Sequence, residues 1–138
     1  IAGERFCVRN SGAETVVEGC GDNGCEYMTG GIAVILGQVG NNFAAGMTGG
    51  MAFVYDKAGL LPLRINLEDV IYQQQMTSYW ENILKTMIED HCDKTQSIHA
   101  KELLNIWEKE KLCFWQVIPK EMINKFERPV LINEAKSA

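Results

Sequence analysis

The residue types that could support catalysis or bind a metal are few and scattered in this sequence. It has five cysteines and two histidines: Cys7, Cys20, Cys25, Cys92, Cys113, His91 and His99. Four residues separate Cys20 from Cys25, whereas zinc knuckles and thioredoxin-like sites use a gap of two. An odd number of cysteines without a disulfide spacing favours buried free thiols in a reducing compartment over a metal or redox role.

Carboxylates and glycine-rich loops are the other candidates for chemistry. Asp22 and Glu26 form a closely spaced acidic pair, which acid–base catalysis could use. They stand in a glycine-rich turn, where carboxylates commonly cap the turn or face solvent. The glycine-rich runs at 37–40 and 46–50 are not followed by the lysine or the helix that a phosphate-binding loop needs. We therefore predict no catalytic, cofactor-binding or metal-binding residue in this chain.

The glycines follow a repeat of 19 residues that indicates a fold. The sequence Met-Thr-Gly-Gly occurs at Met28–Gly31 and again at Met47–Gly50. A short β-rich run closed by glycine turns at a fixed spacing near 20 is typical of a solenoid in which each repeat is one coil. The pattern predicts three rungs of a parallel β-helix, mainly β in class. Six glycines are assigned to structural turns at its corners: Gly12, Gly21, Gly31, Gly40, Gly50 and Gly59.

Strand alternation predicts which side chains face the interior of such a β-helix. Ile32, Val34 and Leu36 belong to columns that are expected to point inward. The intervening apolar row is expected to point outward: Val16, Ile35 and Val54. Soluble monomers seldom expose a continuous apolar strip, so either the C-terminal helical region or another domain of a longer parent chain is expected to cover this row.

The C-terminal region has a different architecture. All thirteen glycines lie in residues 1–59, and a helical region is expected from about Leu67. Apolar residues at helical spacing predict an amphipathic helix over Met76–Ile88, and Ser97 is a candidate N-cap for a second helix. Phe114–Ile118 reads as a short extended piece. The expected domains are β-helix rungs at 1–62, a helical extension packed on them at 63–126, and a polar tail at 127–138.

Charge and hydropathy exclude two classes of partner. The 138 residues carry a net charge of −5, and their thirteen basic residues are not clustered. Nucleic acid is not an expected partner, because binding to phosphates needs a basic face. No apolar run approaches the ~20 residues that span a bilayer, so no membrane partner is expected. The chain begins with Ile1 and partway through a rung, which indicates a segment of a longer or processed polypeptide.

Several motifs together resemble one known family. The glycine-rich part supplies Arg5–Ala13, Val17–Gly31 and Gly40–Gly50. The later part supplies Glu89–His91, Thr95–Ser97, Ala100–Leu104, Trp107 and Phe114–Pro119. From residue 5 to about residue 120, the sequence resembles the C-terminal glycine-repeat (GXGXG) domain of the glutamate synthase large subunit. A subunit of formylmethanofuran dehydrogenase shares the glycine spacing, but not the later motifs.

The resemblance implies a fold and a parent enzyme. In that family the domain is a right-handed, single-stranded β-helix that serves as a scaffold. The parent is a cytoplasmic oxidoreductase that forms two L-glutamates from L-glutamine and 2-oxoglutarate. Its amidotransferase and FMN-barrel domains are the implied partners, with a small NADPH-oxidising subunit as a further candidate. FMN and an iron–sulfur cluster are implied for the parent, and none of the cysteines here matches the ligands of that cluster.

Three functional classes stay open at this point. The first is a non-catalytic scaffold domain of glutamate synthase. The second is a free-standing β-helix used for binding or assembly, related to the formylmethanofuran dehydrogenase subunit. The third, an enzyme built on Asp22 and Glu26, is the least supported, because a solvated or turn-capping role explains both residues.

Overall fold

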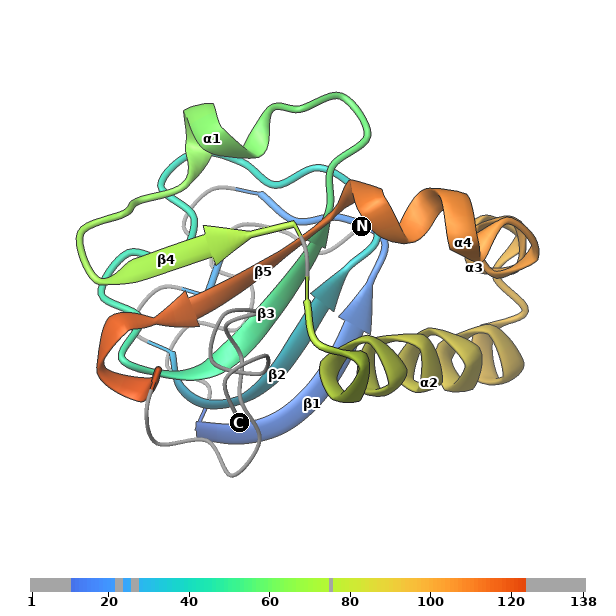
Figure 1. The fold of residues 1–138 in the computed structure, drawn as a ribbon, viewed down its shortest axis with the longest axis horizontal. Helices are drawn as coiled ribbons and strands as arrows, with labels where there is room; N and C mark the ends of the chain where they lie inside the picture. Colours follow the sequence, from blue (N-terminus) through green and yellow to red (C-terminus); the bar gives the residue numbers. More distant parts are fainter. Residues whose placement is uncertain (1–10, 22–23, 26–27, 75, 124–138) are drawn as a thin grey trace.

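The computed structural model describes residues 11–21, 24–25, 28–74 and 76–123 (Figure 1). This part of the chain contains one mixed sheet of five strands in the order β1-β2-β3-β5-β4. The strands are β1 (Ser11–Val17), β2 (Thr29–Ile35), β3 (Gly49–Tyr55), β4 (Val70–Gln73) and β5 (Phe114–Pro119). The helices are α1 (Leu61–Arg64), α2 (Ser78–Thr95), α3 (Ile98–Asn105) and α4 (Trp107–Glu110), with 3-10 turns η1 (Lys111–Cys113) and η2 (Lys120–Met122).

The predicted β-helix is wrong. The repeat does produce three parallel strands, because β1 pairs with β2 and β2 with β3. However, the sheet is open and continues beyond β3. Strand β5 pairs antiparallel with β3, and β4 pairs antiparallel with β5. Among the described residues, the second half of each repeat forms turns and loops instead of further strands. Its glycine- and asparagine-rich composition disfavours strands, so the period records the spacing of parallel strands in an open sheet.

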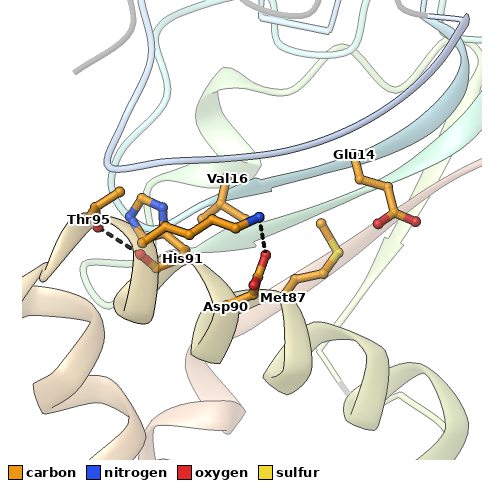
Figure 2. Close-up of a pocket in the computed structure, with 7 residues that line it drawn as sticks. Glu14, Val16, Met87, Asp90, His91 and Thr95 are labelled. Atoms are coloured by element: carbon orange, nitrogen blue, oxygen red, sulfur yellow. Dashed lines mark hydrogen bonds and ion pairs between the residues drawn. The ribbon is translucent and has the colours of Figure 1, made fainter.

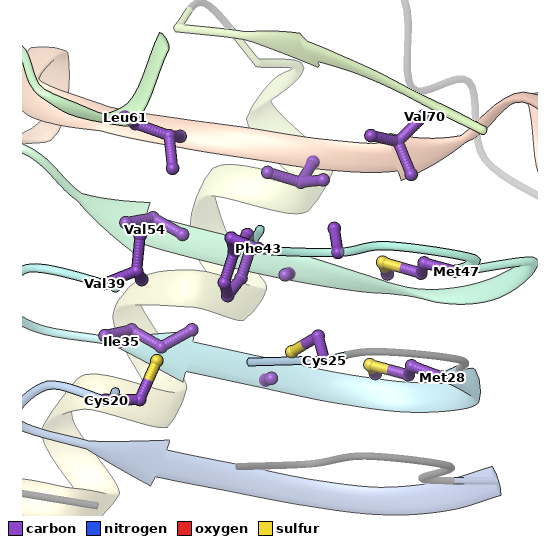
Figure 3. Close-up of a cluster of buried hydrophobic side chains, with 14 residues drawn as sticks. Cys20, Cys25, Met28, Ile35, Val39, Phe43, Met47, Val54, Leu61 and Val70 are labelled. Carbon is purple, nitrogen blue, oxygen red and sulfur yellow. The ribbon is translucent and has the colours of Figure 1, made fainter. Parts of the chain in front are cut away.

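The loops that connect the parallel strands pack against one face of the sheet. Phe43, Met47 and Met28 are fully buried there, in one cluster with the strand residues Ile35 and Val54 (Figure 3). Successive loops are also joined through their backbones: the amide of residue 44 donates to the carbonyl of residue 24, and that of residue 48 to residue 28. This layer of loops buries the apolar side chains on one face of the sheet.

The predicted orientation of the strand side chains is also wrong. Ile35 and Val54 face the loop layer, whereas Val34 and Leu36 belong to the cluster on the opposite, helical face. The register contributes, because Val16 pairs with Val34 and not with Ile35. The β1–β2 pairing and the β2–β3 pairing each shift register near the start of the strands. Alternation separates two rows of side chains, but when both rows are apolar it does not say which row faces which layer.

The helices cover the other face of the sheet, as expected for the C-terminal region. In Figure 1, α2, α3 and α4 lie together on one side of the sheet, away from α1. Leu84 and Ile88 of α2 are fully buried in the cluster that contains Val34 and Phe53. The apolar face of α2 thus packs on the sheet, but of the predicted row only Val16 lies on that face, and Ile35 and Val54 do not.

Local signals in the C-terminal region are confirmed at two places and wrong at one. Ser97 is the N-cap of α3, and its side chain accepts a hydrogen bond from the amide of Ala100. The extended piece at Phe114 is strand β5. The region that was expected to be helical from Leu67 instead contains strand β4, which pairs with β5. No helix in the described part of the chain combines the length and apolar composition that a membrane crossing needs.

Candidate functional site

The structure places the six predicted turn glycines in different backbone environments. Gly31, Gly50 and Gly59 have positive φ angles of 82°, 77° and 74°. Gly21 and Gly40 lie in the loops after β1 and β2, where the amide of Gly40 donates to the carbonyl of Gly21 at 3.3 Å. Gly12 lies within β1. At Gly50, an added Cβ would lie 2.7 Å from the carbonyl oxygen of Gly31, so the close approach of neighbouring strands adds to the constraint on φ.

A buried carboxylate organises the end of β3. Asp56, the first residue after that strand, is 7% exposed. Its carboxylate accepts hydrogen bonds from the backbone amides of Leu60 and Leu61, at 2.9 and 2.8 Å, and from the indole nitrogen of Trp115 at 3.1 Å. Asp56 therefore closes the turn into α1 and ties it to β5. The motif is a side-chain cap of backbone donors.

A second buried carboxylate lies nearby. Glu110 of α4 is 2% exposed and accepts hydrogen bonds from the Tyr55 hydroxyl at 2.5 Å and from the Lys57 ammonium at 3.1 Å. The bond from Tyr55 is the main cause of a lowered pKa of Glu110. Burial and the neighbouring Glu110 charge raise the pKa of Tyr55 and the pKa of the Cys113 thiol. A raised thiol pKa makes Cys113 a poor nucleophile near neutral pH.

A hollow of about 280 Å³ lies between β1 and α2 (Figure 2). Its walls include Val16 of the sheet and Met87 of the helix, with polar groups from Glu14, His91 and Thr95. A neighbouring hollow of about 370 Å³ shares Glu14 and Met87 with it and extends along α2. We call the two hollows together the α2–β1 groove. It runs beside β1, which pairs only with β2 among the described strands and forms one edge of the sheet.

The four described cysteines are not arranged to hold an iron–sulfur cluster. Cys20 and Cys25 lie in the buried cluster of the loop face (Figure 3), whereas Cys92 and Cys113 pack on the helical face. A cluster needs its thiolates around one centre, and the sheet separates these two pairs. Within the described residues, no group of three or more histidine, cysteine or acidic side chains is placed to hold a metal ion. Cys7, Asp22 and Glu26 lie outside the described residues.

Sequence patterns missed the two buried carboxylates. Glu110 stands in the run Glu108-Lys-Glu-Lys111, which reads as a solvated helical face. Its partner Tyr55 is 55 residues away along the chain. Only the packing of α4 against the end of β3 brings the two together. Asp56 had a weak local signal, since an aspartate a few residues before a proline-containing turn is a common cap.

A family model described as the GXGXG motif matches residues 1–120, and this chain belongs to that family. The resemblance expected from the glycine repeat and the later motifs is therefore confirmed.

The relatives of the chain are large enzymes. It is 63% identical over 137 residues to the glutamate synthase (NADPH) large chain of Azospirillum brasilense, which covers 99% of this chain and 9% of that protein. It is 53% identical over 118 residues to ferredoxin-dependent glutamate synthase 1 of Arabidopsis thaliana, covering 86% of this chain and 7% of that protein. The large chain of Bacillus subtilis is 46% identical over 138 residues, covering 99% of this chain and 9% of that protein. The chain thus spans less than a tenth of the relatives it matches.

Proposed function

We propose that this chain is a structural segment of a glutamate synthase large chain and takes no part in the chemistry itself. The similarity to large chains of that name supports the parent. The parent would form two L-glutamates from L-glutamine and 2-oxoglutarate with a reductant, in the cytoplasm. FMN and the iron–sulfur cluster would be held by other parts of the polypeptide, because the described cysteines here lie on opposite faces of the sheet.

The observation that carries this proposal is the hydrogen bonding of the two buried carboxylates. Asp56 is bound by two backbone amides and an indole, and Glu110 by a tyrosine hydroxyl and an ammonium group. A catalytic acid or base must exchange its proton with a substrate. These groups are already committed to joining β3, α1, α4 and β5. Their role is to hold the end of the sheet rigid.

The α2–β1 groove is the surface through which we expect the segment to contact the rest of the large chain. The edge of β1 presents backbone groups that can pair with another strand. The groove beside that edge combines apolar walls, such as Ile32 and Ile83, with polar residues such as Asn82 and Thr86. Apolar walls with polar groups at the margin are typical of contacts between domains. The amidotransferase and FMN-barrel domains are the proposed neighbours.

The first test is an activity measurement. The purified chain is expected to show no glutamine hydrolysis and no glutamate formation, and to be colourless. A complete glutamate synthase large chain, assayed under the same conditions, is the positive control. Activity or flavin absorbance that follows the chain through a sizing column would show that the segment has a catalytic role.

The second test examines the groove in a complete large chain. Thr86→Arg places a long cation in the groove without removing a core side chain, since Thr86 is exposed. We expect this variant to lower the melting temperature of the large chain and its turnover, with little change in KM. Glu102→Arg, an equally exposed site on α3, is the matched control and should be silent. Equal behaviour of the two variants would remove the groove from the contact surface.

A further inference from the structure

Another hollow, of about 430 Å³, lies between the loops that follow β1 and β2. The loop after β1 contributes residues 18–20, the loop after β2 contributes residues 38–41, and α1 contributes Arg64. Gly19 and Gly40 are among these residues, so the backbone of each loop borders the hollow directly. We call this space the Arg64 hollow. It shares no lining residue with the α2–β1 groove.

The walls of the Arg64 hollow are joined to each other by hydrogen bonds. The amide of Leu36 donates to the carbonyl of Val17 at 2.8 Å, where the two loops begin. Within the loops, the amide of Cys20 donates to the carbonyl of Gln38 at 3.2 Å. The hollow is therefore formed before any ligand binds, which lowers the entropic cost of binding.

The Arg64 guanidinium lies at one wall of the hollow and is held there through one of its nitrogens. Nη1 donates to Oε1 of Gln38 at 3.1 Å and to the carbonyl of Val39 at 2.8 Å. Nε and Nη2 have no acceptor among the described residues. A carboxylate binds arginine through two parallel hydrogen bonds from neighbouring N–H groups. The Nε–Nη2 edge of Arg64 is thus positioned by the protein and still available for such a pair.

No carboxylate in the described part of the chain forms an ion pair with Arg64. Glu18 lines the same hollow, but its carboxylate is engaged by the helices. Its Oε1 accepts a hydrogen bond from the Ser97 hydroxyl at 2.6 Å, and its Oε2 lies 3.7 Å from Nε2 of His91. The nearby carboxylate of Asp56 accepts from two backbone amides and an indole. The hollow therefore presents a cation whose charge is not paired, which attracts an anion.

We propose that the Arg64 hollow is a binding site for a carboxylate group, which pairs with the Nε–Nη2 edge of Arg64. A singly charged carboxylate fits better than a phosphate dianion. Arg64 is the one basic residue that lines the hollow in the described part of the chain, and Glu18 adds a negative charge nearby. The carboxylate belongs either to a free small molecule or to an acidic side chain elsewhere in the polypeptide. The site uses residues of this chain alone, so it does not depend on the proposed function.

A titration with succinate tests the site. Succinate is added to the isotopically labelled chain, with sodium chloride at the same ionic strength as the reference. NMR follows the backbone amides of residues 19–21 and 38–41 and the Nε–H group of Arg64. We expect saturable shifts with half-saturation at roughly 1–10 mM, since one charge-assisted pair gives weak binding. Sodium chloride alone should produce no saturable shift.

Gln38→Glu is the most informative variant. The new side chain has the same shape and keeps the acceptor for Nη1, but it places a carboxylate on Arg64. Because Gln38 is exposed, the substitution should leave the fold intact. Succinate binding should weaken at least about fivefold, as the added carboxylate neutralises the cation.

Two substitutions of Arg64 and one control complete the comparison. Arg64→Gln should abolish succinate binding. Arg64→Lys keeps the charge but loses the paired donors, so binding should weaken about threefold. Lys101→Gln removes one positive charge from an exposed position of α3 that does not line the hollow, and it should bind as the wild type does.

The absence of saturable shifts in the wild type would overturn the proposal. Wild-type affinity in Gln38→Glu or in Arg64→Gln would do the same. An equal loss of binding in Lys101→Gln would show a response to net charge only, which also rejects the site. If Arg64→Gln does not fold, Gln38→Glu still decides the question, because it retains Arg64 and its contacts.

Modification by phenylglyoxal, which reacts with accessible arginine, distinguishes the two sources of the carboxylate. Succinate should slow the modification of Arg64 in this chain, as measured by mass spectrometry. The same measurement in a complete glutamate synthase large chain rests on the proposed function. There, protection of Arg64 without succinate would assign an acidic side chain of the polypeptide, and protection only with succinate would assign a free carboxylate. A modification rate that succinate does not change in this chain would reject the site.

Discussion

Replacing Gly50 by alanine is expected to destabilise the fold by about 3–4 kcal/mol, which would make it one of the most damaging single methyl additions in the chain. Two effects add at this position. Gly50 has a φ of 77°, which costs a non-glycine residue about 1–2 kcal/mol. Its new Cβ would also lie 2.7–2.8 Å from backbone atoms of Gly30 and Gly31. Because these neighbours are backbone atoms of β2, they cannot move aside without disturbing the β2–β3 pairing.

Gly59→Ala is the matched control for this substitution. Gly59 has nearly the same φ, 74°, but an added Cβ there would meet nothing within 4 Å. It should therefore show the backbone strain alone, about 1–2 kcal/mol. Urea denaturation of the two variants and the wild type gives the comparison. Equal denaturation midpoints for Gly50→Ala and Gly59→Ala would show that the close approach of β2 and β3 contributes nothing.

Replacing Glu110 by alanine should cost about 2–4 kcal/mol, because it leaves the Tyr55 hydroxyl buried without its acceptor. Tyr55→Phe should cost less, about 1–2 kcal/mol, since the carboxylate keeps its bond from Lys57. Lys57→Ala should have the smallest effect, because the Lys57 side chain is 66% exposed. If Lys57→Ala proved the most damaging of the three, the Tyr55–Glu110 bond would not be the main stabilising contact.

The same carboxylate predicts a pH dependence. The pKa of Glu110 is lowered in the folded state, chiefly by the hydrogen bond from Tyr55. A lowered folded-state pKa contributes stability above the unfolded-state pKa, and this contribution is lost as the pH falls through the folded-state value. The wild type should therefore lose more stability on acidification than Glu110→Gln does. Chemical denaturation from neutral to acidic pH measures this, and parallel curves for the two proteins would contradict it.

Local patterns in the sequence were sufficient for several elements. The apolar spacing from Met76 to Ile88 predicted the buried side of α2, because a helical period places those residues on one face. Ser97 predicted a helix start, since capping depends on residues three positions apart. The glycine repeat predicted parallel strands at a regular spacing, and with the later motifs it indicated the family.

What the sequence determined by itself was therefore local: the spacing of β1, β2 and β3, the buried face of α2, the start of α3, and the family. Only the tertiary structure decided that the sheet stays open, because β5 pairs with β3 over a long sequence separation and then accepts β4 at its other edge. It also decided which face of the strands meets the loops, since both faces are apolar and alternation alone does not distinguish them. The contacts of Glu110 with Tyr55 and of Glu18 with His91 join residues far apart in the chain. Such pairs leave no periodic signal, because they depend on how the packed elements meet and not on spacing along the chain.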